Sequence, residues 1–101
     1  MDIKELISIV TLKQIEDNKF EGQNYKTVWG RVFGGQVLSQ SLHAAYQTVP
    51  DDRTAHSMHG YFILPGDLNE PVIYEVDNIR NGGSFTTRRV VAFQKGKAIF
   101  N

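Results

Sequence analysis

Two histidines in one short block are the side chains of this sequence best suited to proton transfer. His56 and His59 belong to the block His-Ser-Met-His-Gly-Tyr-Phe, and an imidazole titrates near neutral pH, so it can act as a general acid or base. On a strand, their spacing of three residues sends the two side chains to opposite faces, which disfavours a shared metal ion. His56 is our candidate catalytic residue. A core or interface histidine with a satisfied hydrogen bond is the alternative interpretation.

A glycine pair before a helical pattern is the second candidate site. Gly34-Gly35-Gln36 precedes apolar residues at helical spacing, and a helix N-terminus presents unpaired N–H groups and a partial positive charge. Glycine lets a substrate carbonyl approach those groups closely, and Gln36 adds a side-chain donor. We therefore take Gly34, Gly35 and Gln36 as candidate substrate-binding residues. The alternative is that the glycines only permit a tight entry into the helix and close packing.

Three arginines offer contacts for phosphate groups. The planar guanidinium of Arg80, Arg88 or Arg89 matches phosphate oxygens, and we take Arg80 as the candidate substrate-binding residue among them. Arg88 and Arg89 are consecutive, so on a strand only one of them faces a given side. Pairing with acidic residues across the strands is the alternative.

Composition narrows the class of protein. The 101 residues include 11 Lys and Arg against 11 Asp and Glu and no cysteine, so no basic excess indicates a nucleic-acid or membrane partner. The lack of cysteine excludes a thiolate nucleophile and a cysteine-based metal site, and we expect no metal and no cofactor. The apolar runs are too short to span a membrane. Charges near the N-terminus break any signal peptide, so we expect a cytoplasmic domain.

Hydrophobic spacing predicts which elements position these residues. Leu38, Leu42, Ala45 and Val49 form one apolar helical face, which Pro50 ends. The expected helices span residues 2–10, capped by Asp2, and 35–49. The expected strands span residues 19–25, 56–64, 71–80, 84–94 and 97–101, and the stretch between 12 and 19 is expected to continue the first helix.

Two tight turns make the later strands antiparallel. Asn81-Gly82-Gly83 predicts a hairpin because both residue types tolerate positive φ, and Lys95-Gly96 predicts a second turn. The order of strand, long helix and strand meander predicts an α+β domain with a long helix packed on a curved antiparallel β-sheet. This is the arrangement of a single hot-dog domain.

Three blocks in this order resemble the bacterial acyl-CoA thioesterase II (TesB-type) family. The likeness runs from about Leu12 to Asn101, and it implies the hydrolysis of acyl-CoA to free fatty acid and coenzyme A by direct attack of water. Members of that family are double hot dogs, and this sequence resembles their first half. The blocks are Val32–Val37, His56–Phe62 followed by Pro65-Gly66-Asp67, and Arg80–Phe85 followed by Arg88-Arg89-Val90.

The resemblance also implies that the two halves have different roles. The family's catalytic Asp, Ser/Thr and Gln lie in the second half, and Gly34-Gly35-Gln36 occupies the place where that half carries its Asp. We expect residues 1–101 to form one N-terminal thioesterase-like domain, with a last strand cut short at Asn101. The expected partners are acyl-CoA and a second hot-dog unit, either a homodimer mate or a C-terminal half. The alternatives are a non-catalytic acyl-binding or dimerisation module and, ranked last, a hydratase.

Overall fold

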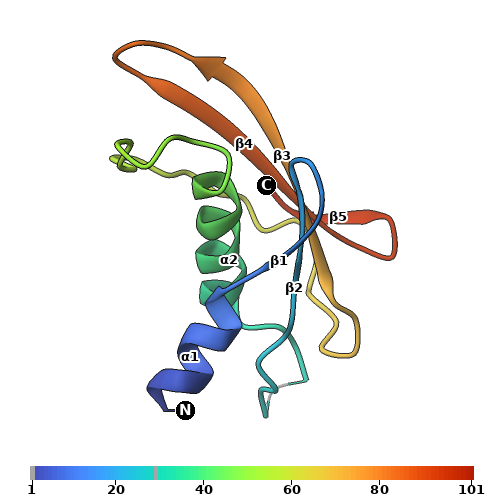
Figure 1. The fold of residues 1–101 in the computed structure, drawn as a ribbon. Helices are drawn as coiled ribbons and strands as arrows, with labels where there is room; N and C mark the ends of the chain where they lie inside the picture. The colour runs from blue at the N-terminus through green and yellow to red at the C-terminus, as the bar shows by residue number, and fades with distance from the viewer. Residues whose placement is uncertain (1, 29) are drawn as a thin grey trace.

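The computed structural model describes residues 2–28 and 30–101, which form a five-stranded antiparallel sheet and two helices (Figure 1). The sheet order follows the chain, β1-β2-β3-β4-β5. The longer helix lies against one face, and the β3–β4 hairpin curves over its C-terminal end (Figure 1). This confirms the predicted hot-dog arrangement. The elements are α1 (Ile3–Val10), β1 (Lys13–Glu16), β2 (Lys19–Gly22), α2 (Gly34–Tyr46), β3 (Val72–Asn81), β4 (Thr86–Gln94) and β5 (Lys97–Phe100).

The two helices begin close to their predicted positions. Asp2 caps α1, since its Oδ1 accepts a hydrogen bond of 2.8 Å from the Glu5 N–H. The α2 helix ends at Tyr46, three residues earlier than predicted, and the chain turns there before Pro50. Within the described part of the chain, no helix is long and apolar enough to cross a membrane.

The stretch after α1 is a hairpin, so the predicted continuation of the helix is wrong. Strands β1 and β2 pair in antiparallel fashion around a turn at Asp17 and Asn18. Asn18 has a φ of 60°, a left-handed conformation that asparagine tolerates better than most residues. Its side chain donates to the Val76 carbonyl at 3.0 Å, which attaches the turn to β3.

Both predicted hairpin turns are present, for different physical reasons. Lys95 and Gly96 have φ values of 51° and 75°, as a two-residue type I′ turn requires. Asn81 and Gly82 do not have positive φ, so that part of the prediction is wrong. The Gly82 N–H donates to the Phe85 carbonyl at 2.8 Å, and a Cβ on Gly82 would collide with the same oxygen. A glycine is therefore required at position 82 because the Phe85 backbone lies too close for a Cβ.

The predicted strand over residues 56–64 is not formed, although all of these residues are described. Only its last part pairs with β5. The Tyr61 N–H donates to the Asn101 carbonyl at 2.7 Å, and the Ile63 N–H donates to the Ile99 carbonyl at 2.8 Å. No described strand lies on the other side of this segment, so most of it remains an extended loop.

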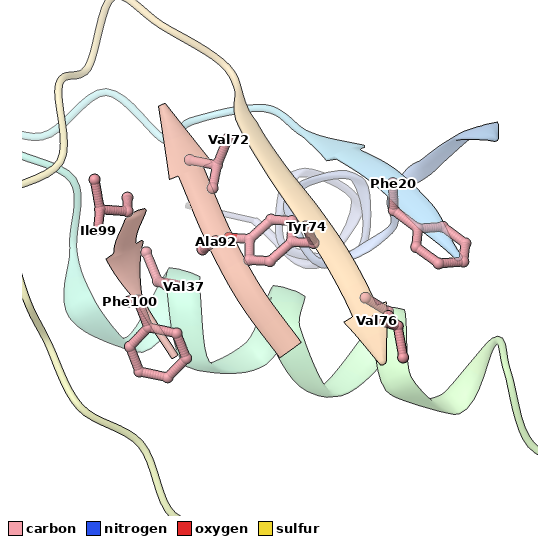
Figure 2. Packing of buried hydrophobic residues seen from close by; sticks show 9 residues of the cluster. Phe20, Val37, Val72, Tyr74, Val76, Ala92, Ile99 and Phe100 are labelled. Carbon is pink, nitrogen blue, oxygen red and sulfur yellow. The ribbon is translucent and has the colours of Figure 1, made fainter. Parts of the chain in front are cut away.

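The core lies between the sheet and α2 (Figure 2). On β3 the alternating residues Val72, Tyr74 and Val76 point inward, as predicted, and Tyr74 is fully buried. The buried side of α2, however, is not the predicted apolar face. It carries Val37 and Ala44 together with the polar residues Gln36, Gln40 and Ser41. The predicted face lies about a third of a turn away and is only partly covered.

Candidate functional site

A groove of about 580 Å³ separates α2 from the segment that follows it and from the tip of the β3–β4 hairpin. The predicted apolar face forms one wall, through Leu42 and Ala45 of α2 and Val49 just beyond its end. Val90 and Phe100 of the sheet line the groove as well. A concave, largely apolar wall of this kind is typical of a site for a small apolar ligand.

Positive charge gathers around the same groove. Its lining includes Arg53, Arg88, Arg89, His56 and His59, and no Asp or Glu from the described residues. The whole chain has equal numbers of acidic and basic residues, so this distribution is strongly uneven. The ion pairs that the described residues form all involve lysines. The three arginines therefore favour an anionic group near the groove.

Arg53 holds the outer wall of the groove together. Its guanidinium donates to three consecutive carbonyls of the hairpin tip, those of Gly82 at 2.8 Å, Gly83 at 2.9 Å and Ser84 at 3.2 Å. Sequence analysis missed this residue because its partners are distant in the chain. The only signal was a charged residue just beyond the end of a helix.

Arg88 is half-buried between the hairpin and the C-terminal end of α2. Its Nε donates to the Thr48 hydroxyl at 2.7 Å, and its guanidinium also donates to the Thr48 carbonyl at 2.9 Å and to the Asn81 side chain at 2.6 Å. All of these acceptors are neutral, so the charge of Arg88 is not compensated. Arg89, the next residue, is exposed.

The residues predicted from sequence are not brought together. His56 lines the main groove, is exposed, and has its ring centroid 5.7 Å from that of Phe85. Gly34 lines a second depression of about 380 Å³ beside the start of α2. Gly35, Gln36 and Arg80 line neither of these two hollows. Arg80 is exposed on β3.

Gln36 is occupied by contacts within the fold. It is 4% exposed, its Oε1 accepts from the Tyr25 N–H at 2.8 Å, and its Nε2 donates to Asn24 Oδ1 at 2.8 Å. Asn24 in turn donates to the Glu70 carbonyl at 2.5 Å. These bonds hold two loops near the start of α2 and favour a structural role for Gln36. Its contact with substrate stays a prediction.

Aromatic rings lie against the two glycines that open α2. A Cβ built on Gly34 would be 3.2 Å from the Phe62 ring, and one built on Gly35 would be 2.5 Å from the Phe33 ring. Glycine is needed at Gly35 for this close approach. The packing favours the structural interpretation of the pair, and the role in binding a carbonyl stays a prediction.

Two titratable groups outside the groove are shifted by burial. His43, predicted to lie on the surface, is half-buried, and desolvation lowers its pKa from the ordinary value of 6.5. Burial also raises the pKa of the Tyr74 phenol, whose hydroxyl donates to Gln40 Oε1 at 2.6 Å. Both groups therefore remain neutral near pH 7, and neither lines the groove.

The fold is that of a hot-dog domain, and comparison with known proteins agrees. The family model described as the acyl-CoA thioesterase N-terminal domain matches residues 24–101. This chain belongs to that family of acyl-CoA thioesterase N-terminal domains.

The relatives are longer than this chain. Acyl-CoA thioesterase 2 of Haemophilus influenzae is 41% identical over 97 residues, which are 96% of this chain and 34% of that protein. Human acyl-coenzyme A thioesterase 8 is 41% identical over 93 residues, covering 92% of this chain and 29% of the other. The chain thus spans about a third of the length of these curated relatives.

Solved structures of the same class superpose closely. A TesB protein of Mycobacterium avium subsp. paratuberculosis has a TM-score of 0.92 at 32% identity, over 98% of this chain and 40% of that one. Acyl-CoA thioesterase II TesB2 of Mycobacterium marinum has a TM-score of 0.85 at 43% identity, over 95% of this chain and 35% of that one. The similarity to the first half predicted from sequence is confirmed.

Proposed function

We propose that this chain is the acyl-binding, N-terminal half of an acyl-CoA hydrolase. The observation that carries the proposal is the groove, in which the apolar side chains of α2 adjoin three arginines and two histidines with no described carboxylate among them. Acyl-CoA combines an apolar chain with anionic phosphates, so it matches both parts of this surface. The names of the relatives, which are acyl-CoA thioesterases, support the same substrate.

The reaction divides between this chain and a second hot-dog unit. Hydrolysis requires water to attack the thioester carbon, the C–S bond to break, and the coenzyme A thiolate to take up a proton. The described lining of the groove offers no carboxylate to activate the water, in line with a catalytic Asp, Ser/Thr and Gln in the second unit. His56, exposed in the lining, is the proposed proton donor to the thiolate.

The second unit has a surface on which to dock. Tyr61 and Phe62 are 72% and 58% exposed, and Met58, Ile63 and Leu64 are also exposed. The backbone here pairs with β5 on one side only, and an unpaired edge beside exposed apolar side chains favours pairing with another chain. We propose that a second copy or a C-terminal half adds here. Light scattering tests the homodimer, which a monomer at high concentration would contradict.

A non-catalytic acyl-binding or dimerisation module is the second candidate function. It is favoured by the structural contacts of Gln36 and by the packing of Gly34 and Gly35 against aromatic rings. The proposed location is the cytoplasm, which cell fractionation would test.

One experiment separates these possibilities. A non-hydrolysable acyl-CoA thioether is titrated into this chain, and turnover of several acyl-CoA chain lengths is measured with and without an added second half. We expect the chain alone to bind the thioether and to turn over substrate only with the second half. Failure to bind would contradict the acyl-binding role.

Variants of His56 and His43 test whether His56 takes part in hydrolysis. Turnover by the chain alone that is lost in His56→Ala would contradict the proposed division between the halves. His43→Ala is the matched control, because His43 lies outside the groove. Binding without turnover in every combination would favour the non-catalytic module.

A further inference from the structure

One buried hydroxyl at the groove has no hydrogen-bond partner. Ser41 is 1% exposed, and its Oγ is unpartnered among the described residues. On α2 it lies between Val37 and Ala44, which are buried against the sheet, and Ala45, which faces the groove. Ser41 itself lines the groove. A buried polar group without a partner is costly, so its presence requires an explanation.

Most other polar side chains of α2 differ from Ser41 in their hydrogen bonding, although His43 Nδ1 is also buried without a partner among the described residues. Gln36 and Gln40 are equally buried but bond through both ends of their amides. The exposed Ser39 donates to the Gly35 carbonyl at 2.8 Å, the usual internal bond of a helical serine. Ser41 does not make the corresponding bond. Its Oγ is therefore a buried hydroxyl without a partner, on a residue that also lines the groove.

We propose that Ser41 binds a hydroxyl group carried by the acyl chain, so that the groove prefers a hydroxylated chain to a plain one. This inference rests on the proposed acyl-binding function. Other hydroxyl side chains also line the groove, and Ser41 is the one of them whose oxygen is buried without a partner among the described residues. A ligand hydroxyl would supply that missing partner. A plain chain leaves the serine unpaired, and sites with a buried polar group discriminate strongly against such ligands.

The position of Ser41 limits where that hydroxyl lies. Arg88 donates to Thr48, two residues beyond the end of α2, and Ser41 lies about 7.5 Å before that end along the helix axis at the usual rise per residue. With the carboxylate of a free fatty acid near the arginines, the preferred hydroxyl is near the middle of that acid's chain. A hydroxyl next to the carboxyl group is too close to the charged end.

The test measures binding without hydrolysis. Dodecanoic acid and its monohydroxylated isomers are titrated into the full chain, into Ser41→Ala, and into the matched control Ser39→Ala, whose hydroxyl lies on the exposed side of α2. We expect one mid-chain isomer to bind about tenfold more tightly than dodecanoic acid, the value of one good hydrogen bond. Ser41→Ala should remove this preference and keep the affinity for dodecanoic acid, and Ser39→Ala should change neither. Circular dichroism confirms that each variant is folded.

Two outcomes overturn the inference in distinguishable ways. Equal affinities for all the acids, unchanged in Ser41→Ala, would show that Ser41 does not select the ligand and would leave the acyl groove intact. Absence of binding by every acid would overturn this inference, and the acyl-binding function would fall with it if the acyl-CoA thioether also failed to bind. A preference that survives in Ser41→Ala would assign it to another residue.

Discussion

The two sides of α2 contrast in polarity and in exposure. The side toward the sheet carries two glutamines and yet is buried, whereas the side toward the groove carries Leu42 and Ala45 and is only partly covered. Gln40 explains the first side, because its Nε2 donates to the Ile9 and Gln23 carbonyls at 2.7 and 2.8 Å. An apolar helical face therefore indicates a surface against which either the protein core or a bound ligand packs. A polar face is buried where its hydrogen bonds are satisfied.

Removing the amide of Gln40 should have the largest effect. Gln40→Ala leaves the part-buried Ile9 and Gln23 carbonyls and the buried Tyr74 hydroxyl without their partner, so we expect a loss of about 3 kcal/mol in the free energy of unfolding. Urea denaturation measures it. Gln47→Ala, at the exposed end of the same helix, is the control and should change stability by less than about 0.5 kcal/mol. Equal effects would show that the two sides of α2 do not differ as described.

Adjacent alanines separate the two sides directly. Ala44 is fully buried against the sheet, and Ala45 lines the groove. Ala44→Leu should overpack the core and cost about 2 kcal/mol of stability, while Ala45→Leu should leave the melting temperature nearly unchanged. Ala45→Leu should instead weaken acyl-CoA binding about tenfold by filling the groove. The account fails if Ala45→Leu binds normally.

A smaller effect distinguishes two arginines of one hairpin. Arg89→Gln should weaken acyl-CoA binding about threefold, and less so at high salt, because an exposed charge contributes modestly and is screened. Arg80→Gln is the matched control, since Arg80 is also exposed but lies outside the groove. A larger loss from Arg80→Gln would favour the residue predicted from sequence over the one indicated by the structure.

The smallest effect is a dependence of stability on pH. Burial lowers the pKa of His43 from 6.5, so on acidification the unfolded chain takes up a proton before the native state does. Stability should be greatest above pH 6.5 and should fall as the pH drops toward the native pKa. His43→Gln should reduce this decline, which urea midpoints across the pH range would reveal. An unchanged decline would exclude His43 as its source.

The sequence was sufficient for the fold but only partly for the site. The alternation of apolar and polar residues predicted β3. The predicted turn at Lys95-Gly96 and the predicted cap of α1 by Asp2 are both present. The prediction of a strand over 56–64 was wrong. This segment lies at an edge, and no described strand pairs with its outer side. Apolar spacing identified the groove wall but assigned it to the core. The buried Gln36 and Gln40 occupy the core side instead, because residues distant in the sequence satisfy their hydrogen bonds.

The residues of the groove show why the rest could not be predicted. Arg53 acts through the carbonyls of a hairpin tip far along the chain, and the orphan hydroxyl of Ser41 is apparent only once its surroundings are known. Gln36 was predicted to bind substrate because it follows two glycines. In the structure, its side-chain amide is hydrogen-bonded to Tyr25 and Asn24 instead. Side-chain type and spacing do not predict hydrogen-bond partners that are distant in the sequence.

The most direct test is to map the binding of a non-hydrolysable acyl-CoA thioether by nuclear magnetic resonance. Amide shifts should change for the groove side of α2 at Leu42 and Ala45, for Val49 just beyond its end, and for the hairpin around Arg89. They should remain unchanged around the second depression near Gly34. Changes confined to Gly34 and Gly35, or no changes at all, would contradict the assignment of the groove as the acyl-CoA site.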